Sequence, residues 1–319
     1  MTMGSVRMPE GKRMASALCF DFDALSLWLG LFRFTTANPL SRGEFGATVG
    51  IPRILDLLDK YDCKATFFVP GHTAQVFPDA VREIHERGHE IAAHSMYHAP
   101  YEVGLAMSGI EPATPEKQRE YLVQQLDVLE KVTGQRAVGF RSPIGDWVGE
   151  HIPQYLIELG FTYDSSLQGH DFVPYRLRIG DKYQTEEPFG VEFGKPSKLL
   201  EIPLHWDTND FAQFEFLGYY MQKDNPWFSP SPFGTPTQVL ENFTSSFDYC
   251  YNNVKGGVWN TILHPQCCGR DMKAAWLENL IRYITDHKDV WHTTMKEVAA
   301  AYDDDLKDPT PTVGSYATA

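Results

Sequence analysis

Two patterns of apolar residues alternate along the chain. Short, nearly continuous apolar runs such as 64–71 ("KATFFVPG") and 90–95 ("EIAAHS") are typical of strands buried on both faces. Elsewhere apolar residues recur every three or four positions, as in 50–61, which predicts helices. The expected strands are 17–20, 64–71, 90–95, 137–143, 161–167, 198–206, 257–265 and 290–295, and the expected helices are 50–61, 77–90, 114–135, 152–160, 235–254, 272–288 and 296–306.

The order of these elements predicts the fold class. Strands and helices alternate in seven or eight units without a break in composition. This favours one α/β barrel, with a parallel sheet inside and helices outside, over two domains. We expect residues 15–306 to form this single domain, with a disordered or tag-like N-terminus over 1–14 and a flexible tail over 307–319.

Long insertions interrupt the repeating units at 27–48 and at 168–198 together with 207–234. Loops of that length in a compact domain are more often functional than idle. The later insertion is rich in aromatic residues and prolines, so we expect it to cover a cleft or to support a homo-oligomer.

Composition narrows the choice of partners. With 43% apolar residues the chain of 319 residues can bury a large core, and a net charge of −14 argues against nucleic-acid binding. No 18-residue apolar span and no signal-like apolar segment is present, so we expect no membrane partner and a cytoplasmic location. Five scattered cysteines without a CxxC pattern suit a reducing compartment.

Ionisable side chains follow the predicted strands. In a parallel α/β barrel, catalytic groups gather at the carboxyl ends of the strands, so residues at these positions are the first candidates for chemistry. In a strand, residues two apart point the same way, so the Asp21 and Asp23 carboxylates would share a direction and repel each other. The candidates are Asp21, Asp23, His94, His98, Arg141, Asp164, His205 and His264.

Each candidate also has a structural interpretation. The two aspartates could be solvated loop residues, and His94 and His98 could be ordinary packed or surface histidines. Two histidines four apart can also share one face of a helical turn, and with a carboxylate they form a common catalytic metal site. Cys267 and Cys268 follow His264, but no third residue that would orient a Cys–His nucleophile is evident.

Four short motifs, in order, resemble those of the polysaccharide deacetylase (NodB-homology) family. They are "FDFDA", "HSMYH", "RSP" and "LHP", and the resemblance covers about residues 15–300. It implies a distorted, TIM-like (β/α)7–8 barrel. One departure is that Phe22 separates two aspartates that are adjacent in the usual first motif. Other segments resemble an intracellular peptidoglycan-deacetylase-like branch, which is similar to cyclic imide hydrolases and allantoinases.

The resemblance implies catalytic roles for four residues of this sequence. Asp21 would be the general base, with Arg141 orienting it. His264 would be the general acid, which protonates the leaving nitrogen. The backbone N–H of Ile144 would donate a hydrogen bond to the oxyanion.

The resemblance also implies a metal site and pocket residues. Asp23, His94 and His98 would bind one divalent ion, with zinc expected first, although cobalt, manganese and nickel also accept two imidazoles and a carboxylate. The residues expected to line the substrate pocket are Asp164, His205 and Trp206.

Three hypotheses for function remain open at this point. The first is a metal-dependent hydrolase of non-peptide carbon–nitrogen bonds that removes acetyl groups from an N-acetylated sugar or glycan. The second is hydrolysis of a small cyclic imide or ureide. The third is a barrel that binds a ligand without catalysis, which would lack the base or the acid.

Overall fold

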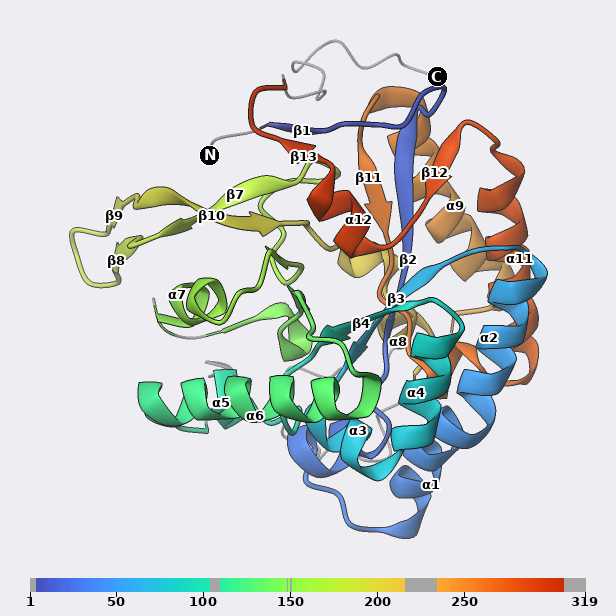
Figure 1. The fold of residues 1–319 in the computed structure, drawn as a ribbon, viewed down its shortest axis with the longest axis horizontal. Helices are drawn as coiled ribbons and strands as arrows, with labels where there is room; N and C mark the ends of the chain where they lie inside the picture. The colour runs from blue at the N-terminus through green and yellow to red at the C-terminus, as the bar shows by residue number, and fades with distance from the viewer. Residues whose placement is uncertain (1–3, 104–109, 148, 150, 216–233, 307–319) are drawn as a thin grey trace.

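A strongly curled, mostly parallel sheet forms the centre of the molecule, and helices cover its outer face (Figure 1). The protein is represented by a computed structural model, which describes residues 4–103, 110–147, 149, 151–215 and 234–306. In spatial order the strands are β11 (Val258–Asn260), β2 (Met14–Asp21), β3 (Ala65–Val69), β4 (Glu90–Ala93), β5 (Gly139–Phe140), β6 (Tyr163–Asp164), β10 (Lys195–Glu201) and β7 (Tyr175–Ile179).

Strand β2 is the most extensively paired strand described. All of its residues are buried, which explains the unbroken apolar run before Asp21. It pairs in parallel with β11 over 15–17, with β12 (Val290–His292) over 14–16, and with β3 over 18–21. The carboxyl end of β2, and with it Asp21, is therefore held firmly in the middle of the sheet.

The ladder of strands is not continuous around the sheet, so the barrel is only partly closed. Beyond β10, the strand β7 pairs antiparallel. The chain that follows β10 instead contacts the chain that follows β11. Asn209 forms an isolated parallel bridge with Ile262, and the Asp210 N–H donates to the Ile262 carbonyl at 3.0 Å. The single-domain α/β barrel predicted from the sequence is confirmed, in the form of a curled and partly open sheet.

Helices follow the strands as the apolar periodicity predicts. Helix α6 shows why its boundaries fall where they do: the Thr114 side chain accepts from the Lys117 N–H at its start, and Gly134 ends it with φ 73°. The main outer helices are α2 (Ile51–Lys60), α4 (Pro78–Glu86), α6 (Pro115–Thr133), α7 (His151–Glu158), α9 (Pro236–Asn253), α11 (Asp271–Asp286) and α12 (Met295–Ala300).

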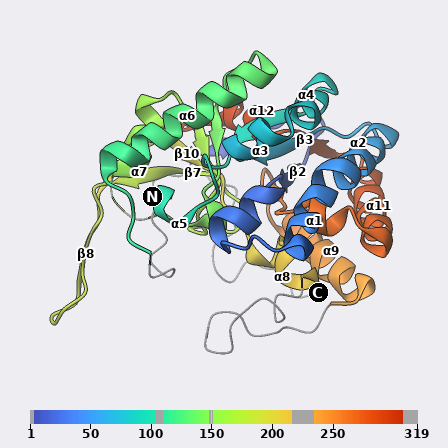
Figure 2. The same cartoon turned by 90° about the horizontal axis from the view of Figure 1, so that it is seen from below.

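The insertions contain structure of their own. The insertion predicted over 27–48 holds the π-helical turn η1 (Leu27–Leu31) and α1 (Ala37–Phe45), and a second π-helical turn, η2 (Gly46–Gly50), extends just past its end. The later insertion adds β7 and a separate hairpin, which Figure 2 shows extending from the body. The hairpin strands are β8 (Lys182–Gln184) and β9 (Gly190–Glu192). Residues 216–233 of this insertion lie outside the described residues.

The N-terminal segment differs from its predicted disorder. Strand β1 (Ser5–Val6) pairs antiparallel with β13 (Tyr302–Asp303), so residues after Gly4 are tied to the end of the domain. The predicted tail over 307–319 lies outside the described residues. All five cysteines are buried and free. Among the described helices, none is both long and apolar enough to cross a bilayer.

Strand β5 depends on a glycine for its packing. A Cβ atom at Gly139 would lie 2.0 Å from the ring of Tyr163, which is fully buried. We expect Gly139→Ala to lower the free energy of unfolding by about 1–3 kcal/mol, because the ring has no room to move. Gly190→Ala in β9 is the control, because nothing lies nearer than 3.8 Å there. Equal denaturation midpoints for the two variants would contradict this account.

Candidate active site

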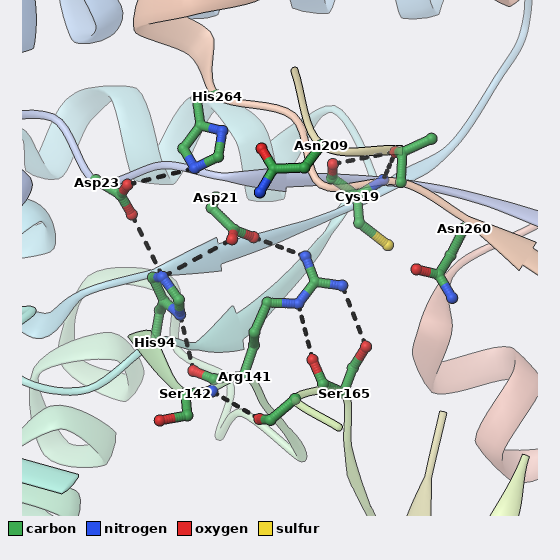
Figure 3. A network of polar contacts seen from close by, with 12 residues as sticks. Cys19, Asp21, Asp23, His94, Arg141, Ser142, Ser165, Asn209, Asn260 and His264 are labelled. Atoms are coloured by element: carbon green, nitrogen blue, oxygen red, sulfur yellow. Dashed lines mark hydrogen bonds and ion pairs between the residues drawn. The ribbon is translucent and has the colours of Figure 1, made fainter. Parts of the chain in front are cut away.

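The candidate active site lies at the carboxyl ends of β2, β4, β5 and β11. It brings together residues that are far apart in the sequence, and all of them are buried (Figure 3). Because parallel strands end on the same edge of a sheet, side chains that follow them converge. The six predicted chemical residues that meet here are Asp21, Asp23, His94, His98, Arg141 and His264.

Three of these residues form a cluster that fits a divalent cation. The Asp23 Oδ1 atom lies 3.4 Å from His94 Nε2 and 3.7 Å from His98 Nε2, and one ligand atom of each residue lies within 4.8 Å of the others. Both carboxylate oxygens of Asp23 are buried without a hydrogen-bond partner among the described residues. Burial raises the pKa of Asp23 well above its usual value, so its ionised form needs a nearby cation.

The histidines present neutral imidazoles to this cluster. The Nδ1 atom of His94 lies 2.7 Å from the Arg141 carbonyl oxygen, which can only accept, so Nδ1 carries the proton. The unprotonated Nε2 then points toward Asp23. Burial lowers the pKa of His94 and that of His98, which keeps both rings uncharged and able to bind a metal.

The loop that carries the two histidines is strained and tightly held. Ser95 and His98 have φ angles of 61° and 56°, in the left-handed region that non-glycine residues avoid. The buried Glu102 carboxylate accepts three backbone N–H groups from this loop, those of Met96, Tyr97 and Ala99. Glu102 was missed in the sequence, where the only signal is an acidic residue four positions after His98.

Asp21 is held ionised by Arg141. The Arg141 Nη1 atom donates to Asp21 Oδ1 at 2.8 Å. Burial alone would raise the pKa of Asp21, but the charge and hydrogen bond of Arg141 outweigh it and hold the pKa below its usual value. The guanidinium is fixed by the carbonyl and hydroxyl of Ser165 and lies 4.0 Å over the Phe68 ring.

His264 is held by a carboxylate that the sequence analysis missed. Its Nδ1 lies 2.7 Å from Asp210 Oδ1, and its Nε2 lies 3.8 Å from Asp23 Oδ2. Burial alone would lower the pKa of His264, but Asp210, assisted by Asp23 and Asp21, raises it to about 9. Asp210 falls in the irregular 207–234 insertion, where only the fold brings it to His264.

The alternative Cys–His nucleophile has no support in the geometry. Cys267 and Cys268 are both fully buried, and burial raises the pKa of each thiol well above its usual value. A protonated thiol is a poor nucleophile, and the accessible nitrogen of His264 points toward Asp23 instead.

A cavity of about 150 Å³ opens onto the six chemical residues. Of the three predicted pocket residues, Trp206 lines it, whereas Asp164 and His205 do not. Asp164 is fully buried behind it, next to Ser166, and His205 stacks on Phe172 with ring centroids 5.1 Å apart. The remaining lining is mostly apolar, from Leu27, Leu31, Phe32, Leu204, Phe211 and Ile262.

Ile144 also lines the cavity, in an unusual backbone conformation. Its φ is 61°, which is costly for a β-branched residue and persists only when neighbouring structure enforces it. The predicted hydrogen bond from its N–H to an oxyanion stays a prediction.

Comparison with known proteins places the chain in a family. A polysaccharide deacetylase model matches residues 44–163. A peptidoglycan deacetylase from Helicobacter pylori is 30% identical over 309 residues, which cover 93% of this chain and 97% of that protein. The chain belongs to the polysaccharide deacetylase family. Its enzymes hydrolyse carbon–nitrogen bonds other than peptide bonds.

Further relatives agree with this assignment. A peptidoglycan deacetylase-like protein, FGM2 of Gibberella zeae, is 28% identical over 88% of this chain and 83% of its own. A polysaccharide deacetylase homologue from Mycobacterium smegmatis, solved by crystallography, is 31% identical with a TM-score of 0.75, over 97% of both chains. Puue allantoinase shares the fold, with a TM-score of 0.67 over 92% of this chain and 91% of its own, at 22% identity.

The deacetylase-family site yields a prediction about metal binding. We expect Asp23→Ala and His94→Ala to weaken divalent-metal binding by more than about 100-fold, because each removes a ligand and even changes outside the ligand set cost 10- to 100-fold. Asp21→Asn is the control and should retain one metal per chain. Metal content and titration calorimetry measure this. Stoichiometric binding by Asp23→Ala would refute the ligand assignment.

Proposed function

We propose that this protein is a metal-dependent hydrolase that removes acetyl groups from an N-acetylated sugar. The observation that carries the proposal is that the two aspartates at the carboxyl end of β2 have different partners. Asp21 is paired with Arg141, whereas the Asp23 oxygens face His94 and His98 with no other partner. One relative is named a peptidoglycan deacetylase and another a peptidoglycan deacetylase-like protein. These names support an acetylated glycan as the substrate.

The residues around the cavity divide the chemistry of amide hydrolysis. A divalent ion bound by Asp23, His94 and His98 would polarise the amide carbonyl and lower the pKa of water. Asp21, kept ionised by Arg141, accepts the proton of the attacking water. The backbone N–H of Ile144 donates to the oxyanion of the tetrahedral intermediate, a contact of a kind worth about 3–4 kcal/mol.

His264 completes the reaction as the general acid. Asp210 holds the imidazole by Nδ1, which leaves Nε2 facing the cavity. A pKa of about 9 keeps the ring protonated near neutral pH, so Nε2 carries the proton that the leaving nitrogen needs. Because residues suited to act as base and as acid both face the cavity, we favour a hydrolase over a barrel that only binds.

The size of the cavity favours a second candidate substrate class. A space of about 150 Å³ with mostly apolar walls suits a small ring better than a long glycan. Cyclic imides and ureides contain the same amide bond in a compact ring, and the same groups would open it. We therefore keep imide or ureide hydrolysis as the alternative.

A substrate panel tests the proposed function. Metal-loaded protein is incubated with N-acetylglucosamine oligomers, and separately with dihydrouracil, hydantoin and succinimide. We expect acetate release from the first group, loss of activity with a chelator, and recovery on adding metal. Ring opening alone would replace the first substrate class by the second. If neither class is turned over, the proposed function is wrong.

The pairing of His264 with Asp210 predicts a change in pH dependence. His264 must be protonated to act, so activity falls as the pH rises through its pKa. Asp210→Asn removes the neighbouring charge and should move this alkaline limb of kcat/KM down by about 1 pH unit or more. Asp207→Asn, at an exposed neighbouring carboxylate, is the control. An unchanged limb in Asp210→Asn would exclude His264 as the acid.

A further inference from the structure

Two carboxyl groups lie buried behind the cavity. Asp164 and Glu201 pair directly across the parallel strands β6 and β10, and both are 0% exposed. Neither lines the cavity. Burying two acidic groups side by side is costly, and apolar residues of similar size would fill the same space at less cost. Their presence therefore calls for a specific role.

The contacts of this carboxyl pair lead to the backbone beside the cavity. Asp164 Oδ1 accepts from the Ser166 hydroxyl at 2.8 Å, and that hydroxyl oxygen accepts from the Ser142 N–H at 2.8 Å. Glu201 Oε1 accepts the N–H groups of Ser166 at 3.0 Å and Leu167 at 2.8 Å. The carboxyl pair thus fixes Ser166, and Ser166 fixes Ser142.

Ser142 begins the turn that presents Ile144. The Gly145 N–H donates to the Ser142 carbonyl at 3.0 Å and closes the turn with Ile144 at φ 61°. A Cβ at Gly145 would lie 2.8 Å from the Ser166 carbonyl oxygen, so the turn packs closely on the same residue. A strained turn of this kind needs several restraints, and Ser166 supplies them.

The same segment holds the partner of the general base. Ser165, between Asp164 and Ser166, accepts from Arg141 through both its carbonyl and its hydroxyl, as Figure 3 shows. Displacement of residues 165–166 would therefore disturb Arg141 as well as the 142–145 turn.

Burial disfavours two negative charges at this carboxyl pair. Burial raises the pKa of Glu201 well above its usual value, and the adjacent Asp164 raises it further. Burial also raises the pKa of Asp164 to about 6. The two carboxyl groups therefore titrate as one coupled pair, and a proton between them relieves the repulsion of two buried charges.

We propose that Asp164 and Glu201 form a positioning pair that fixes the Ser142–Ile144 backbone for catalysis. This inference rests on the proposed function for its effect on turnover, but the restraint on the turn can be measured without substrate. It also gives a role to Asp164, which was predicted to line the substrate pocket but is fully buried and does not line the cavity.

The test compares substitutions that preserve or remove the hydrogen bonds. Glutamine at 201 can still accept the two N–H groups through its amide oxygen, whereas alanine cannot. We expect Glu201→Ala and Asp164→Asn to lower kcat about 10- to 100-fold with KM nearly unchanged. Glu201→Gln should keep a kcat close to that of the wild-type protein. Deuterium uptake by the peptide covering 141–147 should rise in Glu201→Ala and Asp164→Asn and stay at the wild-type rate in Glu201→Gln. Metal content should be the same in all of these variants.

Specific outcomes would overturn the positioning role. Wild-type kcat and uptake in both Glu201→Ala and Asp164→Asn would exclude it, and the same damage in Glu201→Gln as in Glu201→Ala would exclude the role of Glu201 as an acceptor. If Asp164→Asn does not fold, Ser166→Ala removes the linking hydroxyl alone, and wild-type uptake in that variant would exclude the role. If the wild-type protein hydrolyses nothing in the substrate panel, the proposed function fails, while the uptake measurements still decide the positioning role.

Discussion

The site depends on keeping two carboxylates ionised at the buried end of one strand. Asp21 and Asp23 lie on β2's carboxyl end with at most 5% exposure, where burial and mutual repulsion both oppose ionisation. Arg141 compensates Asp21 with a direct hydrogen bond. The Asp23 oxygens face two neutral imidazoles and accept no hydrogen bond from the described residues, so a second positive charge can bind there. Because Asp21 is paired with an arginine whereas Asp23 faces two neutral imidazoles, two residues of the same type have different chemical properties.

Arg141 connects the parts of this arrangement. Its guanidinium holds Asp21, while its backbone carbonyl accepts the Nδ1 proton of His94 and so turns the other ring nitrogen toward Asp23. Ser165 in turn fixes the guanidinium. A residue at the end of β5 thereby orients both Asp21 on β2 and His94 after β4. The strand order β2–β3–β4–β5 places these ends within reach.

Strained backbone occurs at several points around the cavity. Ser95, His98 and Ile144 all have positive φ. The Gly71 N–H donates to the Ser95 carbonyl, the Ser95 hydroxyl accepts from the His98 N–H, and the Ser166 hydroxyl accepts from the N–H of Ser142, two residues before Ile144. Strain of this kind is stored where geometry matters for binding or catalysis. The buried carboxyl groups of Glu102 and Asp164 hold the strained loops in place, although neither residue lines the cavity.

The sequence by itself determined the alternating elements, the α/β class and the candidates at strand ends, because apolar periodicity and residue type are local properties. The buried run before Asp21 and the spacing of His94 and His98 were visible in this way. Only the tertiary structure decided that Asp210 faces His264, that Glu102 holds the histidine loop, and that Asp164 lies behind the cavity. These contacts depend on the path of irregular loops and on the curvature of the sheet. Loop paths and sheet curvature leave no periodic pattern in the sequence.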